Sequence, residues 1–248
     1  MSFEFRPAVR ENVPLLIGLA GGTGSGKTFS AMTLAKGIAG SKRFAVIDTE
    51  NGRALHYAED FQFDHTRLDA PFRPERYAEA IAAADAGGYP VIVVDSMSHE
   101  WAGDGGCLDW HEEEMRGQES RNLLAWIKPK MAHKQMLTRL LQIKAHVILC
   151  FRAEPKVEIG KDKDGKTAIV PKASLTGLDG WIPIAEKNLP YELTASFLLM
   201  ADAPGVPKPI KLQEQHKTLV RLDGPLGEGA GKRLAEWAAG KTPAKAAA

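Results

Sequence analysis

The sequence lacks the features that mark secreted, membrane-spanning or strongly charged proteins. Its two cysteines, Cys107 and Cys150, are too few for a disulfide framework and fit a reducing compartment. No run approaches the roughly 18 consecutive apolar residues of a membrane span, and Glu4, Arg6 and Arg10 stand where a signal peptide is apolar. Lys and Arg number 32 against 31 Asp and Glu, so overall charge favours neither nucleic acid nor a membrane. We therefore expect a cytoplasmic protein with no membrane partner.

The composition that is present is ordinary for a globular domain, with 44% hydrophobic and 25% charged residues. A length of 248 residues suits one large domain with a small appendage. We assign residues 1–225 to a core and 226–248 to a C-terminal helix and disordered tail. EGAGKRLAEWAAG (228–240) predicts that helix, with Leu234 and Trp237 docking on the core. Upstream, 191–202 predicts a strand and 207–222 a hairpin that closes the sheet.

A phosphate-binding loop is the clearest motif. The apolar run LLIGLA (15–20) leads into GGTGSGKT (21–28), which satisfies G-x-x-x-x-G-K-[ST], and FSAMTLAKGIAG follows with helical spacing and Gly40 as a stop. Backbone N–H groups of such a loop surround phosphate oxygens, and the helix N-terminus adds positive charge. A Gly-rich turn without function is the alternative, but the strand before and the helix after disfavour it. The predicted nucleotide-binding residues are Gly21, Gly22, Thr23, Gly24, Ser25, Gly26, Lys27 and Thr28.

Two carboxylates follow apolar strands further along the chain. PVIVVDSMS (90–98) places Asp95 where it can hold Mg²⁺ together with Thr28, although a strand-end Asp can also cap the next turn. FAVIDTE (44–50) ends in Glu50, which can orient or deprotonate an attacking water, or can be a loop acid or helix cap. Asp48 lies closer to the strand, and we expect it to be structural. Continuous apolar runs such as VIVV are typical of parallel strands buried on both faces.

The order of three motifs resembles the core of the RecA-like P-loop ATPases: GGTGSGKT, then VIDTE, then VIVVDS. The resemblance implies an α/β fold with a mostly parallel central sheet flanked by helices, here with a C-terminal β-hairpin extension. It implies ATP and Mg²⁺ as cofactors, Lys27 and Glu50 as catalytic residues, and HVILCFR (146–152) as the next core strand. RecA has a glutamine where Arg152 stands; the arginine can stabilise transition-state charge or pair with an acid.

The compact layout is similar to small phage-encoded ATPases with a RecA core, a group that includes single-strand annealing and recombination proteins. This resemblance implies single-stranded DNA as a partner, a single-strand-binding or other replication or recombination protein as a further one, and a homo-oligomer in the form of a ring or filament. A phage-encoded member would work in the cytoplasm of its bacterial host.

Charge is unevenly placed along the chain. Residues 100–119 carry seven acids and one arginine, whereas 120–153 carry seven basic residues and no acid. Leu137, Leu140 and Leu141 predict a buried stripe that leaves a basic face, which could follow DNA phosphates, meet the acidic segment or be solvated. In RecA-like proteins the loop after the HVILCFR strand contacts single-stranded DNA. Here 153–173 predicts a loop or hairpin, and its tentative DNA contacts are Lys156, Lys161, Lys163 and Lys166.

Other features leave alternatives open. The acidic 100–119 segment would repel phosphate, and its Trp101 and Trp110 suit a protein partner as well as bases. The spacing of His99, Cys107, Asp109, His111 and Glu112 matches no zinc pattern. Two rival functions are a nucleotide-dependent binding or regulatory module that acts on a protein partner, and a P-loop kinase. A kinase usually needs several lid arginines, where 153–173 has lysines.

Overall fold

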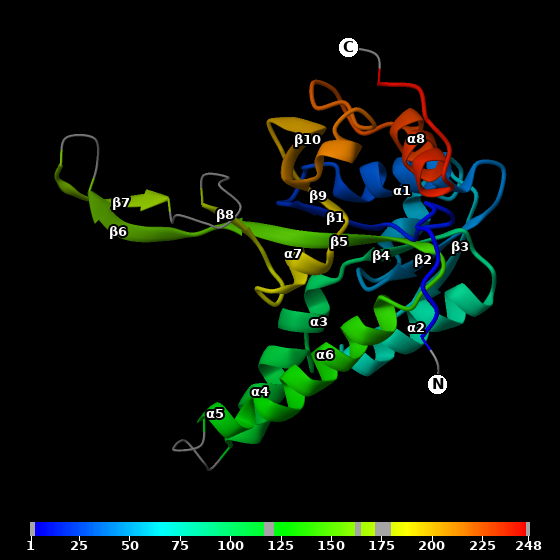
Figure 1. The fold of residues 1–248 in the computed structure, drawn as a ribbon. Coiled ribbons are helices and arrows are strands. Elements are labelled where there is room, and N and C mark those ends of the chain that lie inside the picture. Colours follow the sequence, from blue (N-terminus) through cyan, green and yellow to red (C-terminus); the bar gives the residue numbers. More distant parts are fainter. Residues whose placement is uncertain (1–2, 117–121, 162–164, 172–179, 247–248) are drawn as a thin grey trace.

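The computed structural model describes residues 3–116, 122–161, 165–171 and 180–246. A central sheet has the strand order β10-β9-β1-β5-β4-β2-β3, with β8 pairing with β5 (Figure 1). From β9 to β3 every pair of neighbours is parallel, whereas β10 and β8 pair antiparallel with β9 and β5. The strands of this sheet are β1 (Leu16–Gly21), β2 (Phe44–Asp48), β3 (Phe63–Arg67), β4 (Val91–Asp95), β5 (His146–Pro155), β8 (Trp181–Pro183), β9 (Ala195–Met200) and β10 (Ala203–Leu212).

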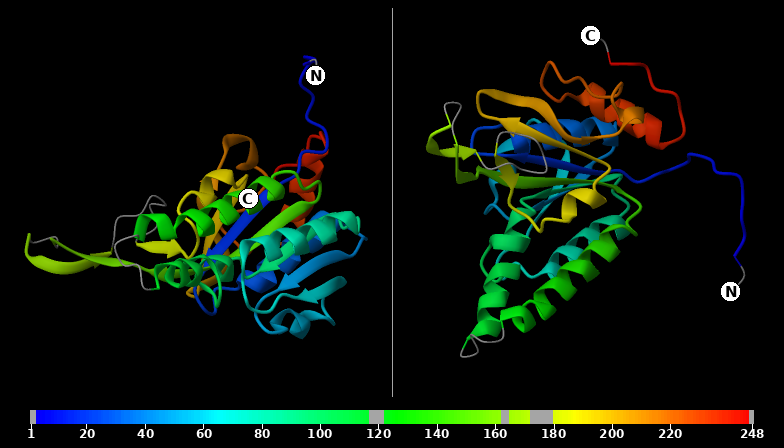
Figure 2. Two further views of the ribbon diagram at one scale, coloured as in Figure 1. Left: turned by 90° about the horizontal axis from the view of Figure 1, so that it is seen from below. Right: turned by 60° about the vertical axis from the view of Figure 1, so that its left-hand side comes forward.

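Helices cover both faces of the sheet, which gives three layers (Figures 1 and 2). Helices α1 and α8 pack on one face, and α2 and α6 pack on the other. No helix in the described ranges has both the length and the apolar character needed to cross a membrane. The helices are α1 (Lys27–Ala39), η1 (Arg53–Tyr57), α2 (Pro74–Ala86), α3 (Ser98–Ala102), α4 (Cys107–Met115), α5 (Asn122–Ala125), α6 (Ile127–Leu140), α7 (Leu189–Glu192), η3 (Glu214–His216) and α8 (Glu228–Ala238).

The core divides by the side-chain alternation of the strands. Along β1, Ile17 and Leu19 face α1 and α8, whereas Leu16 and Ala20 face α2 and α6. All six β1 residues are buried, as the continuous apolar run predicts for a central parallel strand. Because β1 is packed on both faces of the sheet, it holds the phosphate loop that follows it, and with it the start of α1, in a fixed position.

The C-terminal helix α8 packs closely against the helix of the phosphate loop. A Cβ added at Gly37 of α1 would collide with the carbonyl oxygen of Glu228, and one added at Gly231 of α8 would collide with that of Leu34. The two glycines therefore allow the helix backbones to approach closely. Leu234 is 2% exposed at this contact, as the sequence predicts.

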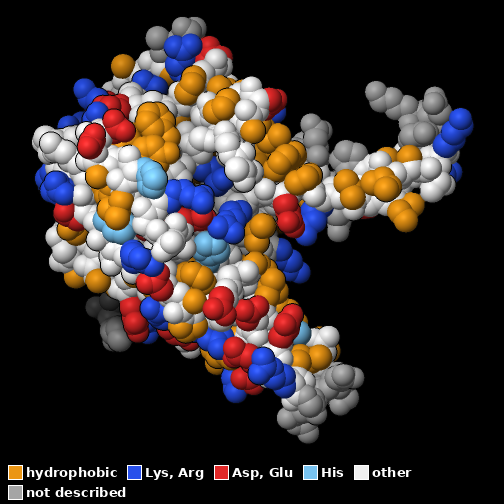
Figure 3. All heavy atoms as spheres, turned by 180° about the vertical axis from the view of Figure 1, so that it is seen from behind, with side chains coloured by type: hydrophobic (Ala, Val, Ile, Leu, Met, Phe, Trp, Pro, Cys, Tyr) orange, Lys and Arg blue, Asp and Glu red, His pale blue; other side chains and the backbone are white. Residues whose placement is uncertain are grey.

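A long antiparallel hairpin continues from β5 and projects from the body. It consists of β6 (Val157–Lys161) and β7 (Thr167–Pro171). Figures 1 and 2 show it as an arm away from the sheet, and Figure 3 shows hydrophobic side chains along it with basic side chains near its tip. Val157, Ile159 and Ile169 are 61%, 82% and 75% exposed on this arm. For the described residues of 153–173, the hairpin interpretation is therefore confirmed.

Two sequence expectations differ from the structure. The antiparallel hairpin at the edge of the sheet consists of β9 and β10, not of two strands within 207–222, because the polar segment after Leu212 forms η3 instead. On α6 the buried face contains Met136 and Leu140, whereas Leu141 follows the helix and is 56% exposed. Leu140 is therefore buried as predicted, whereas the prediction of a buried Leu141 is wrong. The basic residues Lys134, Arg139 and Lys144 are exposed, as expected.

The α1–α8 contact yields a paired test. We expect Gly231→Ala to lower the free energy of unfolding by about 1–3 kcal/mol, because its methyl group would push α8 away from α1. Gly229→Ala is the matched control: its added methyl meets only the flexible end of Arg233, at 3.2 Å, and alanine favours the helix by about 1 kcal/mol. Urea denaturation measures both. Equal stability of the two variants would contradict the tight contact.

Candidate active site

The phosphate loop forms because glycines permit backbone conformations that other residues avoid. β1 ends at Gly21 and α1 begins at Lys27, and between them Gly24 and Gly26 take φ values of 74° and 81°. The hydroxyl of Ser25 donates to the carbonyl oxygen of Gly22 at 2.8 Å and closes the loop. The first turn of α1 contains no acidic residue, so the positive end of its dipole is uncompensated. The geometry suits an anion such as a phosphate.

Lys27 and Thr28 extend from the first turn of α1 over this loop. The ammonium of Lys27 donates to the carbonyl oxygen of Gly22 at 2.9 Å, and burial lowers the pKa of Lys27. The hydroxyl of Thr28 donates to Oδ2 of Asp95 at 2.5 Å. Asp95 is buried, and that burial raises the pKa of its carboxyl. A hydroxyl and a carboxylate that meet beside a phosphate loop are the hard oxygen donors that Mg²⁺ prefers, so these residues fit that ion.

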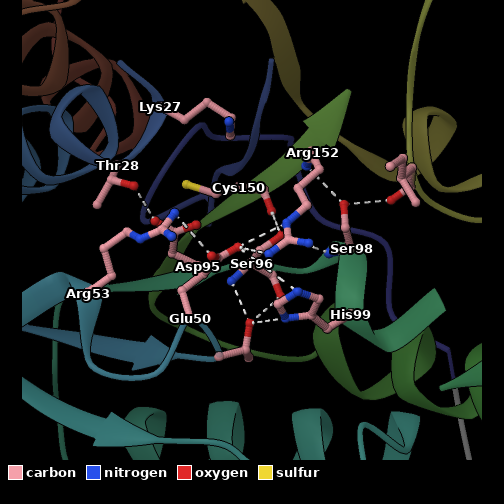
Figure 4. A network of polar contacts seen from close by, with 12 residues as sticks. Lys27, Thr28, Glu50, Arg53, Asp95, Ser96, Ser98, His99, Cys150 and Arg152 are labelled. Atoms are coloured by element: carbon pink, nitrogen blue, oxygen red, sulfur yellow. Dashed lines mark hydrogen bonds and ion pairs between the residues drawn. The ribbon is translucent and has the colours of Figure 1, made fainter. Parts of the chain in front are cut away.

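Glu50 lies between two arginines beside this pair (Figure 4). Its Oε1 accepts bonds from Nε and Nη2 of Arg152 at 3.0 and 2.7 Å, and its Oε2 lies 3.1 Å from Nη1 of Arg53. Nε2 of His99 is 4.0 Å from Oε1. The carboxylate is only 10% exposed, whereas the two arginine side chains are 49% and 67% exposed. Arg53 and Arg152, which are partly exposed to water, therefore hold the carboxylate of Glu50, which is largely buried.

The backbone that carries Glu50 is fixed by Asp48. Oδ1 of Asp48 accepts the N–H of Glu50 at 2.6 Å, and Oδ2 accepts the N–H of Ala54 at 2.8 Å. Nε2 of His65 lies 3.2 Å from the same Oδ2. Asp48 is 1% exposed, so its oxygens serve the turn rather than the pocket. This agrees with the structural role that the sequence suggests for it.

A second set of contacts joins the ends of β2 and β4. Oγ1 of Thr49 accepts the N–H of Ser96 at 2.8 Å and lies 2.7 Å from Nδ1 of His99. Burial lowers the pKa of His99, with Arg152 acting in the same direction. The neutral imidazole therefore bridges α3 to the turn before Glu50. Ser98 connects the next strand, since its Oγ accepts the N–H of Arg152 at 2.9 Å.

The phosphate loop, Asp95, and Glu50 with its two arginines line one pocket of about 690 Å³, a volume within the range of small-molecule sites. Phe29 and Tyr57 contribute aromatic surface beside the phosphate loop, with ring centroids 6.1 Å apart. The predicted nucleotide and catalytic residues line this pocket together: Gly21, Gly22, Thr23, Gly24, Ser25, Gly26, Lys27, Thr28, Glu50, Asp95 and Arg152. Sequence reasoning missed Arg53, for which the only signal was its position three residues after Glu50.

The tentative DNA-contacting lysines lie elsewhere. Lys161 ends β6 and Lys166 immediately precedes β7, on the projecting hairpin. Lys156 stands at the start of the hairpin and pairs with Glu154 at 2.7 Å. Lys163 lies outside the described residues. The hairpin lysines are therefore separate from the phosphate pocket, and only the base of the arm adjoins it through Glu154.

The described part of the acidic segment, residues 100–116, is a folded structure in which α3 and α4 place several of the carboxylates against partners. Glu100 is buried, Glu113 pairs with Arg73 at 2.6 Å, and Glu114 pairs with Lys128 at 2.8 Å. This last pair joins the acidic and basic stretches within one chain, which was one of three expectations for the basic segment. Its tryptophans also have internal partners: Trp101 stacks on Trp126 and Trp110 lies under Arg73.

The chain was compared with protein families and with curated protein sequences, and one of the two comparisons finds a match. The model of a family described as AAA domain matches residues 14–182, more than half of the chain. The matched region contains the phosphate loop, both pocket carboxylates and Arg152. A search of curated protein sequences returns no match to this chain.

The position of Lys27 gives a direct binding test. We expect Lys27→Ala to weaken binding of a nucleoside triphosphate by about 10–100-fold, because a charged hydrogen-bond donor contributes roughly 1.5–3 kcal/mol. Lys42→Ala removes an exposed lysine beyond the end of α1 and is the control. Titration calorimetry with a non-hydrolysable analogue measures both. An unchanged dissociation constant for the Lys27 variant would remove that residue from phosphate binding.

Proposed function

Because the chain belongs to the AAA domain family of P-loop ATPases, we propose that it binds ATP with Mg²⁺ and hydrolyses the terminal phosphate. The observation that carries this proposal is the convergence of a phosphate loop, the Thr28–Asp95 pair and Glu50 in one pocket. Backbone N–H groups of the loop and the start of α1 hold the phosphates. When ATP binds, the ammonium of Lys27 leaves the carbonyl oxygen of Gly22 and bonds to a phosphate oxygen, whose negative charge it neutralises.

Thr28 and Asp95 would hold Mg²⁺, which when bound neutralises charge on the phosphate oxygens. The hydrogen bond between them places a hydroxyl oxygen and a carboxylate oxygen 2.5 Å apart, and both oxygens would face the cation once the Thr28 hydroxyl, which keeps its proton, turns that proton away from Asp95. Asp95 is held by its place at the end of the buried strand β4. A rigid carboxylate of this kind fixes the position of the cation relative to the loop.

Glu50 is the group that accepts a proton from the attacking water. A carboxylate that is 10% exposed and anchored through the turn at Asp48 keeps a defined position at the pocket. Arg152 bonds the same carboxylate and lines the same pocket, so it can exchange Glu50 for a phosphate oxygen as charge develops in the transition state. Arg53 holds the other carboxylate oxygen and is more exposed.

The role of Glu50 has a sharp test. We expect Glu50→Gln to bind ATP as tightly as the unmodified protein but to lose turnover by about 10²–10⁴-fold, since the amide cannot accept the proton. Phosphate release under saturating Mg·ATP measures turnover, and calorimetry measures affinity. Glu59→Gln, an exposed acid in the segment after η1, is the matched control. Retained turnover in the Glu50 variant would remove this residue from the mechanism.

We further propose that the ATPase acts on single-stranded DNA as a homo-oligomer, in phage recombination, annealing or replication. Support comes from the resemblance to RecA-like proteins and from the arm β6–β7, which follows directly from the strand that carries Arg152. Lys161 and Lys166 place positive charge toward the tip of this arm. DNA held there would be linked to the pocket through one continuous strand, β5.

The partner is tested by phosphate release from Mg·ATP with and without single-stranded DNA, with Lys27→Ala as the blank. We expect DNA to stimulate release, and Lys161→Ala/Lys166→Ala to weaken DNA binding and reduce its salt dependence, because fewer counterions are released. Lys42→Ala/Lys232→Ala removes two exposed lysines elsewhere and is the charge-matched control. Equal stimulation in both double variants would exclude the hairpin lysines. Absence of any DNA effect would exclude DNA as the activator.

A second candidate function is favoured by one observation. Leu123, Leu124 and Met131, at the end of the molecule formed by α5 and the start of α6, are 86%, 58% and 55% exposed. Exposed apolar side chains in such a group are typical of protein-binding surfaces. Nucleotide binding without DNA-stimulated hydrolysis would favour a module that acts on a protein partner.

A further inference from the structure

Outside the nucleotide pocket, three helices bring a carboxylate, a thiol and an imidazole together. Glu100 belongs to α3, Cys107 opens α4, and His133 lies on α6. Oε1 of Glu100 is 3.3 Å from Sγ of Cys107 and 2.9 Å from Nδ1 of His133. The three donor atoms all lie within 4.8 Å of one another. Figure 1 shows these helices grouped on one side of the sheet.

The cluster is deeply buried and contains an anion. Glu100, Cys107 and His133 are 1%, 0% and 4% exposed. In the part of the chain that the structure describes, the only basic side chain that pairs with Glu100 is His133. A buried carboxylate without a cation costs several kcal/mol, so the charge on Glu100 requires a partner inside the cluster.

Protonated His133 is one such partner, but it is an incomplete one. Its other ring nitrogen, Nε2, is buried with no hydrogen-bond partner among the described residues. The imidazolium form would therefore leave a charged N–H without an acceptor, which is costly in a site shielded from water.

We propose that Glu100, Cys107 and His133 bind a divalent transition-metal ion of the Zn²⁺ class. Thiolate and imidazole donors with one carboxylate suit Zn²⁺, with bonds of about 2.3 Å to sulfur and 2.0–2.2 Å to nitrogen and oxygen. Tetrahedral bonds of those lengths separate the donor atoms by roughly 3.3–3.6 Å. The two observed separations from Glu100, 2.9 and 3.3 Å, are slightly shorter, so these two pairs need to move apart by only a few tenths of an ångström, and the thiol and the imidazole lie within 4.8 Å of each other.

The charges and protons balance. As the metal–sulfur and metal–nitrogen bonds form, the thiol of Cys107 releases its proton to the solvent, and the protonated ring of His133 releases the proton on Nδ1, whose lone pair then binds the metal. Two negative donors, Glu100 and the Cys107 thiolate, then neutralise one divalent cation. The ring keeps a neutral N–H at Nε2 in place of a charged one. A water molecule completes the three protein donors to four.

Such an ion would tie the helical region to the nucleotide pocket. Glu100 directly follows His99, whose ring contacts Thr49 beside the catalytic carboxylate. α3 has five residues. Without the metal, two hydrogen bonds to Glu100 join it to α4 and α6 in this cluster. A bound cation replaces those bonds with metal–ligand bonds. The bound ion then holds His99 in place beside the turn before Glu50.

Cobalt titration of the full chain tests the proposal, because Co²⁺ occupies zinc sites and a thiolate ligand adds a charge-transfer absorption band. After removal of metals with a chelator, we expect one Co²⁺ per chain, a thiolate band, and loss of that band when Zn²⁺ is added. Zn²⁺ should also raise the melting temperature, since a ligand that binds the folded state stabilises it. Absence of a thiolate band in the unmodified protein would overturn the proposal and leave a hydrogen-bonded triad.

Matched variants identify the ligands. Cys107→Ser keeps a donor to Glu100 but should lose the thiolate band, whereas Cys150→Ala removes the other buried cysteine and should keep it. His133→Gln should weaken Zn²⁺ binding by about a hundredfold or more, because even outer partners of metal ligands contribute 10–100-fold. Lys27→Ala should bind Co²⁺ normally, which separates this site from the nucleotide pocket. A band that survives in Cys107→Ser would also overturn the proposal.

Discussion

The shared direction of four neighbouring strands is the constraint on which the candidate active site depends. In the parallel register, Gly21 at the end of β1 lies opposite Arg152 of β5, and Asp48 at the end of β2 lies opposite Asp95 of β4. Since the carboxyl ends of parallel strands meet at one edge of the sheet, the phosphate loop and the polar residues arrive at the same place. The chemistry of the pocket follows from that alignment.

Burial in this pocket favours neutral side chains, and the neighbouring charges act in both directions: Lys27 opposes the effect of burial on the pKa of Asp95, whereas Glu50 adds to it. Lys27 and Asp95 are each penalised by desolvation, so the pKa of the amine falls and that of the carboxyl rises. Each also feels the opposite charge of the other, which favours the ionised forms. Glu50 instead has two arginines that remain partly hydrated. The pocket therefore combines the desolvated pair Lys27 and Asp95 with Glu50, whose two arginine partners stay in contact with water.

The sequence predicted most of what is local and little of what is long-range. The phosphate loop, the helix that ends at Gly40 and the acid at the end of β4 were predictable because glycine conformations, helical spacing and apolar runs are properties of neighbouring residues. Membership of the AAA domain family agrees with the resemblance that those motifs carry. The bond between Glu50 and Arg152 joins residues 102 positions apart, and no local pattern contains it.

The wrong expectations have the same origin. Residues 207–222 contain strand-forming and turn-forming residues, but β10 finds its partner in β9, and this choice depends on which sheet edge is free in the folded chain. The acids of 100–119 were grouped by sequence, whereas the fold buries Glu100, pairs Glu113 with Arg73 immediately before α2, and pairs Glu114 with Lys128 of α6. Charge counted along a segment does not determine which carboxylates meet solvent.

The contact between α1 and α8 has a consequence for biosynthesis. α1 is synthesised long before α8, yet one of its sides packs against residues 228–238. During translation at about 5–20 residues per second, that side stays without its native cover for roughly ten seconds or more after α1 has been synthesised. A nascent chain therefore exposes apolar surface on the helix that begins with Lys27, and the phosphate loop reaches its final support only after α8 has docked.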